Sequence, residues 1–388
     1  MLLRSLYNEF FRSEKSGGLL LVLVTGISLF LANSSLQIPY VAFWHIDLCG
    51  ESVGHWINDG LMTLFFLLIG LELEREIYCG ELSSLKNASL PLFAALGGML
   101  VPAALFLLFN MGAETRTGAG IPMATDIAFA LAILSLLGKR VPLSLKIFLT
   151  ALAVIDDLGA ILVIAIFYNS SLSILHLSLA LSVLALLILL NRLKVNYLFP
   201  YLVGGVAMWY FMLHSGIHAT ITGVILAGAI PFGDGQRKSP SFRLQHFLHK
   251  PVAFVILPLF AMANTAIPLG DTWLSCMGEP HSLGILWGLI VGKPLGILLF
   301  SVVGVMLGLC ALPTGINWRQ LASVGFLGGI GFTMSIFITL LAFDTDTLII
   351  SSKISIMTAS LSSGIMGYTA LRLTLPAHGC VISSSFSC

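Results

Sequence analysis

"TALAVIDDLGAILVIAIFY", which runs from Thr150 to Tyr168, places two adjacent acids in an otherwise apolar stretch. A helix needs about 20 such residues to cross the hydrocarbon core of a bilayer, so this stretch is long enough. Asp156 and Asp157 lie near its centre, where one charged residue costs roughly 2.5–3.5 kcal/mol on insertion scales. The stretch therefore predicts a membrane span that contains a functional polar site.

The whole chain has the composition of a polytopic membrane protein. Of its 388 residues, 57% are hydrophobic and only 10% are charged, and the mean hydropathy is +0.99. A soluble domain carries about 25% charged residues. The net charge of +1 excludes a strongly basic surface, so no nucleic-acid partner is expected. The six cysteines include no CxxC pair, and neither a disulfide framework nor a structural metal site is predicted.

Apolar runs separated by polar residues, Gly or Pro predict an all-α protein with twelve transmembrane helices. An even number of spans places both termini on one side of the bilayer. All of the 19 Lys and Arg residues except Arg116, Lys293 and Lys353 fall on that side, so both termini are predicted to be cytoplasmic. The predicted spans lie near 17–32, 57–78, 90–110, 120–138, 143–168, 172–190, 198–213, 216–231, 246–266, 283–310, 321–342 and 352–374.

Two connecting segments stand out, and neither indicates a second domain. "YVAFWHIDLCGESVGHW" (Tyr40–Trp56) alternates apolar and polar residues around a turn, and predicts either a small external β-hairpin near 40–56 or an irregular loop. "GDGQRKSPSFRLQHFLHK" (Gly233–Lys250) predicts a cytoplasmic connector near 232–250. We expect residues 1–388 to form a single integral-membrane domain.

Four ionisable residues are predicted to lie deep in the membrane: Asp126, Asp156, Asp157 and Lys293. Together they cost on the order of 10 kcal/mol before compensation. A buried ion pair that only fixes helix packing is one interpretation, but it accounts for Lys293 and one acid and leaves two acids unpaired. A pathway for ions or protons accounts for all four residues.

The fourth and eleventh spans are predicted to be interrupted. "GAGIPMATDIAFA" contains Gly120 and Pro122, and "GFLGGIGFTMSIF" contains Gly328, Gly329 and Gly331. An offset of 208 residues aligns Gly120 with Gly328 and Thr125 with Thr333. Two glycine-interrupted spans at corresponding positions of two halves indicate inverted repeats with a transport site at their interface.

Charge balance connects these features. Two crossed, interrupted helices bring two positive N-termini together and two negative C-termini together. The negative charge of Asp126 suits the positive N-termini, and the positive charge of Lys293 suits the negative C-termini. Asp156 and Asp157 point about 100° apart on a helix, so one acid can face a cation pathway while the other pairs with Lys293. Burial and mutual repulsion favour protonation of at least one acid. Such an acid can hold either a proton or a small hard cation, but not both. This competition predicts proton–cation antiport.

The chain resembles the bacterial NhaA-type sodium/proton antiporter family along nearly its whole length. The resemblance rests on several motifs together, because an isolated Asp-Asp pair is not specific. These motifs are "WINDGLMTLFFLLIGLE" (Trp56–Glu72), "IPMATDIAFA" (Ile121–Ala130), "KIFLTALAVIDDLGAI" (Lys146–Ile161), "SGIHAT" (Ser215–Thr220), "GKPLGI" (Gly292–Ile297) and "GIGFTMSIFI" (Gly329–Ile338).

The resemblance implies a twelve-helix fold with inverted repeats and two crossed, broken helices, the fourth and the eleventh. It implies that Asp157 is the leading cation ligand and proton carrier, with Asp156 beside it as a partner of Lys293. Thr125 and Asp126 would line the site at the helix breaks. It further implies electrogenic exchange of cytoplasmic sodium or lithium for external protons across a bacterial inner membrane. No cofactor is implied, and a homodimer would form through the external hairpin.

The resemblance also implies a pH response at the cytoplasmic funnel. Two positions depart from the family pattern, because residue 74 is Glu where relatives often carry a base and residue 245 is Gln where an acid is expected. An alternative interpretation of 72–76 is a solvated helix end, and His218 is alternatively a packed, hydrogen-bonded histidine. The residues assigned to the pH response are Glu72, Glu74, Arg75, Glu76, His246, His249 and His218.

Two other functions fit parts of the sequence. A cation/proton antiporter that prefers potassium would share the same acids, since selectivity depends on geometry that the sequence does not reveal. An intramembrane aspartyl protease also places acids in the bilayer, but it needs acids on separate helices and normally a Gly-x-Gly-Asp motif. "IPFGDG" (Ile230–Gly235) lacks the first glycine, and a buried lysine has no role in that chemistry.

Overall fold

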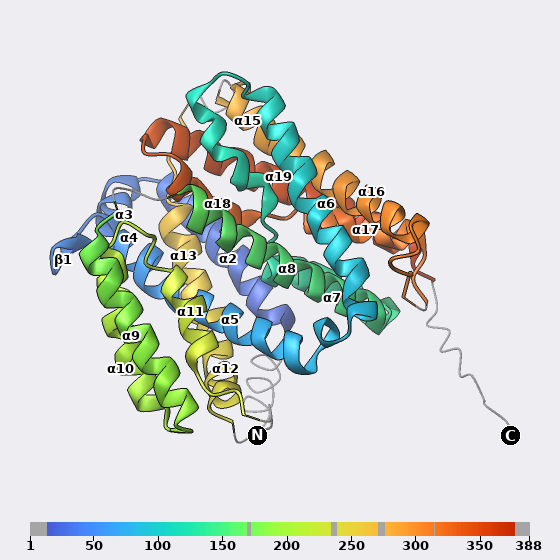
Figure 1. Cartoon of the computed structure of the whole chain (residues 1–388). Helices are drawn as coiled ribbons and strands as arrows, with labels where there is room; N and C mark the ends of the chain where they lie inside the picture. Colours follow the sequence, from blue (N-terminus) through green and yellow to red (C-terminus); the bar gives the residue numbers. More distant parts are fainter. Residues whose placement is uncertain (1–13, 169–171, 234–238, 271–275, 314, 377–388) are drawn as a thin grey trace, which may run out of the picture.

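A computed structural model of the chain describes residues 14–168, 172–233, 239–270, 276–313 and 315–376. These residues form a helical molecule with one two-stranded ladder, β1 (Asp47–Leu48) and β2 (Glu51–Ser52) (Figure 1). The helices are α2 (Glu14–Ala32), α3 (Gln37–Trp44), α4 (Val53–His55), η1 (Trp56–Leu61), α5 (Met62–Cys79), η2 (Glu81–Ser83), α6 (Leu85–Phe109), η3 (Glu114–Met123), α7 (Ile127–Leu136), η4 (Gly138–Arg140), α8 (Leu143–Phe167), α9 (Ile174–Arg192), α10 (Leu198–Leu213), α11 (Ile221–Ala229), α12 (Pro240–Pro251), η5 (Val252–Ile256), α13 (Leu257–Asn264), α15 (Pro280–Trp287), η6 (Gly288–Gly292), α16 (Lys293–Met306), α17 (Trp318–Gly328), α18 (Phe332–Ala342) and α19 (Asp346–Thr374).

Each of the twelve predicted ranges contains helix, but not every helix is long enough to cross a membrane. Within the described residues, seven helices qualify by length and apolarity, or up to ten if each sharply bent pair counts as one span. The shortfall lies at α10 and α11, which have 16 and 9 residues. Helix length alone therefore supports a polytopic membrane protein, and the number twelve stays a prediction.

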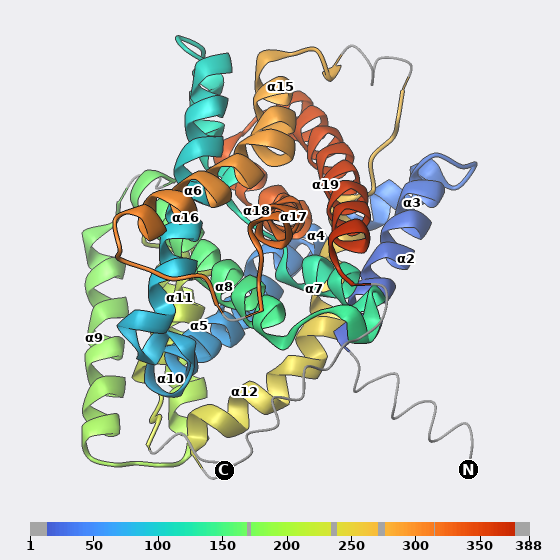
Figure 2. The same cartoon turned by 90° about the vertical axis from the view of Figure 1, so that its right-hand side faces the viewer.

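α8 is the central helix of the molecule. It passes through the middle of the bundle (Figure 1), and 67% of its most apolar stretch is buried inside the protein. The same share for α9 is 11%, and α9 packs against α10 at the edge of the bundle. The view turned by 90° again places α8 inside and α9 outside (Figure 2). The helix that carries Asp156 and Asp157 is therefore surrounded by other helices.

The first interruption separates η3 from α7, which are bent by 41° relative to each other. Pro122 is the last residue but one of η3. It has no N–H to donate and disfavours helical backbone at the preceding residue, which weakens the helix at this point. Ala124 and Asp126 then adopt extended backbone before α7 begins at Ile127. The fourth predicted span is thus broken within the predicted motif.

The second interruption separates α17 from α18, with a bend of 47°. α17 ends at Gly328, and Gly329 and Gly331 flank the short connection to Phe332. A side chain at Gly329 would collide with the carbonyl oxygen of Leu289 in η6, so the close approach of these backbones requires glycine. The eleventh predicted span is therefore also broken at its glycines.

The two breaks correspond at an offset of 205 residues, and the predicted offset of 208 is wrong. η3 and α17 end at Met123 and Gly328, and the following helices begin at Ile127 and Phe332 (328 minus 123, and 332 minus 127). Chance matches of glycine and threonine produced the shift of three residues, because Gly120 lies inside η3 whereas Gly328 ends α17.

The segment predicted as a β-hairpin is largely helical. α3 occupies Gln37–Trp44 and is bent by 119° from α2. Only β1 and β2 pair, with Asp47 opposite Ser52 and Leu48 opposite Glu51 in antiparallel register. The turn between them places Cys49 and Gly50 at positive φ. The ladder is therefore confined to 47–52 within the predicted range of 40–56.

Candidate functional site

Asp156 forms an ion pair inside the protein. Its Oδ2 lies 2.8 Å from Lys293 Nζ, and both side chains are 0% exposed. The same oxygen accepts a hydrogen bond of 2.7 Å from the hydroxyl of Thr125, which lies in the first helix break. α8, α16 and the break before α7 therefore meet at one carboxylate. The structure brings together three residues that the sequence predicted for one site.

Asp126 joins the two helix N-termini at the breaks. As the N-cap of α7, its Oδ1 accepts from the backbone N–H of Phe129 at 3.0 Å. Its Oδ2 accepts from the backbone N–H and the hydroxyl of Thr333, at 3.1 and 2.5 Å, in the first turn of α18. A carboxylate at a helix N-terminus is stabilised by unpaired N–H groups and by the helix dipole. This arrangement agrees with the predicted placement of Asp126.

The helices that precede the two breaks, η3 and α17, end next to Lys293 and Thr125. Lys293 Nζ also donates to the carbonyl oxygen of Met123, the last residue of η3. The hydroxyl of Thr125 lies 2.8 Å from the carbonyl oxygen of Gly328, at the end of α17. The two breaks also contact directly, since the N–H of Asp126 donates to the carbonyl oxygen of Ile330 at 2.6 Å. Lys293 thus neutralises one helix end, whereas the single hydroxyl proton of Thr125 can go either to Asp156 or to the other helix end.

Asp157 has a different environment from Asp156. It is 1% exposed and forms no ion pair within the part of the chain that the structure describes, whereas Asp156 pairs with Lys293; Oδ1 of each acid lacks a hydrogen-bond partner among the described residues. Asp157 also lines a cavity of about 280 Å³. The polar residues around this cavity are Glu72, Arg75, Glu76, Thr150, Gln245 and His249. A carboxylate that lines a cavity and is not held in an ion pair is suited to bind a cation or a proton.

The residues predicted for the pH response fall into two groups. Glu72, Arg75, Glu76 and His249 line the cavity of Asp157, and His249 Nδ1 lies 3.7 Å from Glu72 Oε1. The end of α5 is therefore a cavity wall rather than a fully solvated helix end. Gln245, which stands where the family carries an acid, lines the same cavity.

Three further predicted residues lie away from this cavity. Glu74 accepts a hydrogen bond of 3.1 Å from Ser241 of α12. His246 stacks on Phe242 with a centroid distance of 6.3 Å. His218 shares a hydrogen bond of 2.7 Å with Thr220, and its Nε2 lies 3.7 Å from Asp59.

The structure buries ionisable residues beyond the four that were predicted to lie deep in the membrane. Lys353, predicted on the external side, is 9% exposed in α19, and its amine donates to Asn264 at 3.1 Å. Asn264 in turn donates to Asn58 at 2.8 Å. α19 begins at Asp346, before the predicted start of the twelfth span at 352, so Lys353 lies about two turns inside the helix. No sequence pattern connects Lys353 with an asparagine 89 residues away.

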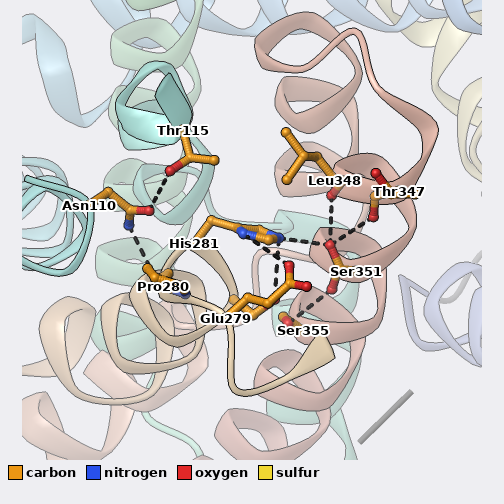
Figure 3. A network of polar contacts seen from close by, with 10 residues as sticks. Asn110, Thr115, Glu279, Pro280, His281, Thr347, Leu348, Ser351 and Ser355 are labelled. Atoms are coloured by element: carbon orange, nitrogen blue, oxygen red, sulfur yellow. Dashed lines mark hydrogen bonds and ion pairs between the residues drawn. The ribbon is translucent and has the colours of Figure 1, made fainter. Parts of the chain in front are cut away.

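A second buried group that the sequence analysis missed is His281, at the start of α15. Figure 3 shows it between Glu279 and Ser351, and it is 2% exposed. Asn110, at the end of α6, donates to Pro280 beside it at 3.3 Å and accepts from Thr115 at 2.7 Å. This network connects α6, α15 and α19, and it includes none of the residues that the sequence predicted for the site.

The fold and the site define a class of protein. Interrupted membrane helices that meet at buried ionisable residues are the arrangement of ion-coupled secondary transporters. Comparison with known proteins gives the family. The sequence pattern of the family described as "Na+/H+ antiporter 1" matches residues 8–371. The chain belongs to this family, whose members are transporters and not enzymes.

Individual relatives match along nearly their whole length. The chain is 64% identical to "Na(+)/H(+) antiporter NhaA 1" of Flavobacterium johnsoniae, covering 97% of this chain and 99% of the relative. It is 63% identical to "Na(+)/H(+) antiporter NhaA" of Flavobacterium psychrophilum, covering 97% and 98%. A solved structure of the sodium proton antiporter MjNhaP1 from Methanocaldococcus jannaschii has a similar fold, with a TM-score of 0.53 and 18% identity, over 95% of this chain and 100% of the other.

Proposed function

We propose that this chain exchanges sodium or lithium for protons, as a single integral-membrane domain in a bacterial inner membrane. The family assignment and the names of the relatives support the reaction. The observation that carries the proposal for the site is the environment of Asp157. This carboxylate lines a cavity and forms no ion pair among the described residues, next to an acid that is already paired with Lys293.

Asp157 binds either a proton or a cation in this proposal. The ion pair with Lys293 holds Asp156 in place, so the two neighbouring acids do not compete for the same lysine. Thr125 orients Asp156, and Asp126 holds the two helix breaks together. A small hard cation prefers oxygen ligands, which the carboxylates and hydroxyls around the breaks supply. Binding of a cation at Asp157 releases its proton, and this competition couples the two fluxes.

The cavity is the entrance from the cytoplasm in this proposal. Its wall at α5 and α12 carries Glu72, Glu76 and His249, and the acids raise the local concentration of cations. The segments 72–76 and 246–249 adjust activity to pH, which serves sodium and pH homeostasis. Twelve spans, crossed broken helices and cytoplasmic termini complete the topology. A homodimer forms through the segment that contains β1 and β2.

Transport in proteoliposomes tests this proposal. A pH gradient is imposed across vesicles that contain the purified protein, and sodium, lithium or potassium is added outside. We expect sodium and lithium to dissipate the gradient and potassium to have little effect. A response to potassium alone would assign the chain to a different cation, and no response to any of the three would contradict antiport.

The protease alternative has no support from the site. Asp156 and Asp157 lie on one helix, and Lys293 pairs with the first of them. The "IPFGDG" segment extends from Gly233 into residues that lie outside the described part of the chain. Membership of a transporter family also disfavours hydrolysis.

A further inference from the structure

Lys353 is a buried lysine whose partner is a neutral amide. It is 9% exposed in α19, and its amine donates to Asn264 Oδ1, at the end of α13, at 3.1 Å. Within the part of the chain that the structure describes, Lys353 forms no ion pair. Burial of an amine costs free energy unless its hydrogen bonds are made, so the contact with Asn264 matters for this residue.

Asn264 extends this contact to a third helix. Its Nδ2 donates to Asn58 Oδ1 in η1 at 2.8 Å and to the carbonyl oxygen of Phe260, one turn earlier in α13, at 3.0 Å. A carbonyl oxygen only accepts, so the amide nitrogen must face Phe260 and the amide oxygen must face Lys353. The amine therefore donates to Asn264 whether or not it carries a charge. Lys353, Asn264 and Asn58 form a polar bridge that joins α19, α13 and η1.

The polar bridge lies at the end of the helices opposite to the cavity of Asp157. η1 and α5 belong to one continuous span, Val53–Cys79, and α12, η5 and α13 belong to another, Pro240–Asn264. Glu72 of the first span and His249 of the second line the cavity. Each of them lies about 20 Å along its span from the polar bridge. The bridge thus joins the ends of two spans whose opposite ends form the cavity wall.

Three buried rings lie between the polar bridge and the helix breaks. Phe337 packs against Phe66 and Phe260, with centroid distances of 5.2 and 6.4 Å. Along α18, Phe337 lies one turn beyond Thr333, which follows the second break. Along α13, Phe260 lies one turn before the polar bridge. The rings and the bridge are therefore two successive layers that close the side away from the cavity.

The face of α19 that carries Lys353 also reaches the second break. Ser360 lies about two turns after Lys353, and its hydroxyl accepts from the backbone N–H of Phe332 at 3.1 Å. α19 packs mainly against α15, α17 and α18, whereas α5 packs mainly against α11 and α12. The polar bridge therefore ties the helices that hold the second break to the helices that form the cavity wall.

We propose that Lys353, Asn264 and Asn58 are positioning residues that form a latch, which keeps the side away from the cavity closed. The inference rests on the proposed antiport. A transporter exposes its site to the two sides in turn by moving one group of helices against another. When α19 moves away from α13 and η1, the polar bridge opens and water replaces its hydrogen bonds. The bridge thus stabilises the state in which the cavity of Asp157 is open, relative to the opposite state.

The test is the KM for sodium, measured separately on the two faces of the membrane. Inside-out and right-side-out membrane vesicles present opposite faces of the protein to the added sodium. The apparent affinity on each face is reduced according to the fraction of the protein that is open to that face. The ratio of the two KM values, cytoplasmic over external, therefore follows the population ratio of the two states.

Lys353→Met keeps the apolar stem and removes the donor. We expect this ratio to rise about threefold or more, the factor that one hydrogen bond between membrane helices contributes to an equilibrium. Asn264→Ala should raise it at least as much, and the double variant should not exceed Asn264→Ala, because both changes break the same link. Asn58→Ala removes only the outer link at a half-buried position and should also raise the ratio. Lys353→Arg keeps a donor and should leave the ratio near that of the wild type.

Asn110→Ala is the matched control. The buried amide of Asn110 also donates to the carbonyl oxygen of the residue one turn earlier, Phe106, at 2.8 Å, and to that of Pro280 in α15 at 3.3 Å. α6 and α15 pack against each other, and neither contributes to the polar bridge. Loss of this amide should lower the midpoint of thermal unfolding and leave the ratio of the two KM values unchanged.

Two outcomes separate this inference from the proposed function. If the ratio does not rise in Lys353→Met and Asn264→Ala, or if both KM values change by the same factor, the latch is refuted, even where the variants unfold at a lower temperature. If the wild type exchanges no sodium on either face, the proposed function is refuted and the latch with it.

Discussion

Lys293 Nζ lies 2.8 Å from Asp156 Oδ2, whereas the adjacent Asp157 forms no ion pair among the described residues and lines a cavity. Both acids are buried on one helix, so burial does not distinguish them. The position of the lysine does. It stabilises the charge of Asp156, and Asp157, which lines the cavity, is the acid that we propose exchanges a proton for a cation.

Replacement of Asp157 by Asn should abolish exchange. The amide has nearly the same size and keeps one acceptor oxygen, but it neither releases a proton nor attracts a cation by charge. The measurement is sodium-dependent dissipation of a proton gradient, compared with wild type at equal protein density in the vesicles.

Asp47→Asn is the matched control, because Asp47 is an exposed residue of β1. It should exchange sodium at the wild-type rate. Substantial exchange by a correctly inserted Asp157→Asn protein would exclude Asp157 as the obligatory carrier and direct attention to Asp156 or Asp126.

Lys293→Ala should destabilise the protein more than Lys293→Arg. Removal of the amine leaves Asp156 and the carbonyl of Met123 without their donor, and breaking a buried ion pair costs about 3–5 kcal/mol. Arg keeps the charge, although its planar group fits the position less well. The midpoint of thermal unfolding in detergent measures the difference.

The double variant Lys293→Ala with Asp156→Asn should recover part of the lost stability, because the uncompensated charge is removed together with its partner. If the double variant is less stable than both single variants, the pair does not account for the stabilising role of Lys293.

Transport should be electrogenic. The site contains three acids and one lysine, which offer more titratable charge than one bound sodium ion balances. Each uncompensated charge exchanges about 2.3 kcal/mol with a membrane potential of 100 mV. A potassium gradient with valinomycin imposes such a potential on vesicles, and the sodium flux should change with its sign. A flux that does not respond to the potential would indicate electroneutral exchange.

Much of the ion site was predictable because the relevant signals are local. A charged residue in an apolar run is conspicuous, and Pro122 and the glycines from 328 to 331 mark the breaks by their backbone chemistry. Charge balance among four residues predicted that Lys293 pairs with one of the two adjacent acids. The family resemblance then identified that acid as Asp156. The predicted assignment of Asp126 to the helix N-termini also agrees with its hydrogen bonds to Phe129 and Thr333.

Features that depend on side-chain reach or on long-range packing were not predictable. Lys353 lies at the start of the predicted span 352–374, but α19 begins earlier, at Asp346, and the amine of Lys353 bonds to Asn264 inside the protein. His281 and Ser351 meet because α15 packs on α19, and each residue alone is an ordinary polar group at the end of a span. The offset between the two breaks was wrong by three residues, since common residue types match by chance.

The last prediction separates two positions that depart from the family pattern, residues 74 and 245. Gln245 lines the cavity of Asp157, whereas Glu74 is bonded to Ser241 on another face of α5. Gln245→Glu adds a titratable carboxylate to a cavity that already contains Glu72 and Glu76, so we expect the pH profile of exchange to shift. Glu74→Gln keeps an acceptor for Ser241 and lies outside the cavity, so it should shift the profile less than Gln245→Glu does. The measurement is the rate of sodium/proton exchange as a function of pH on the cavity side. Superimposable curves for Gln245→Glu and wild type would show that the cavity wall does not set the pH response, which would then belong to the acids of the site.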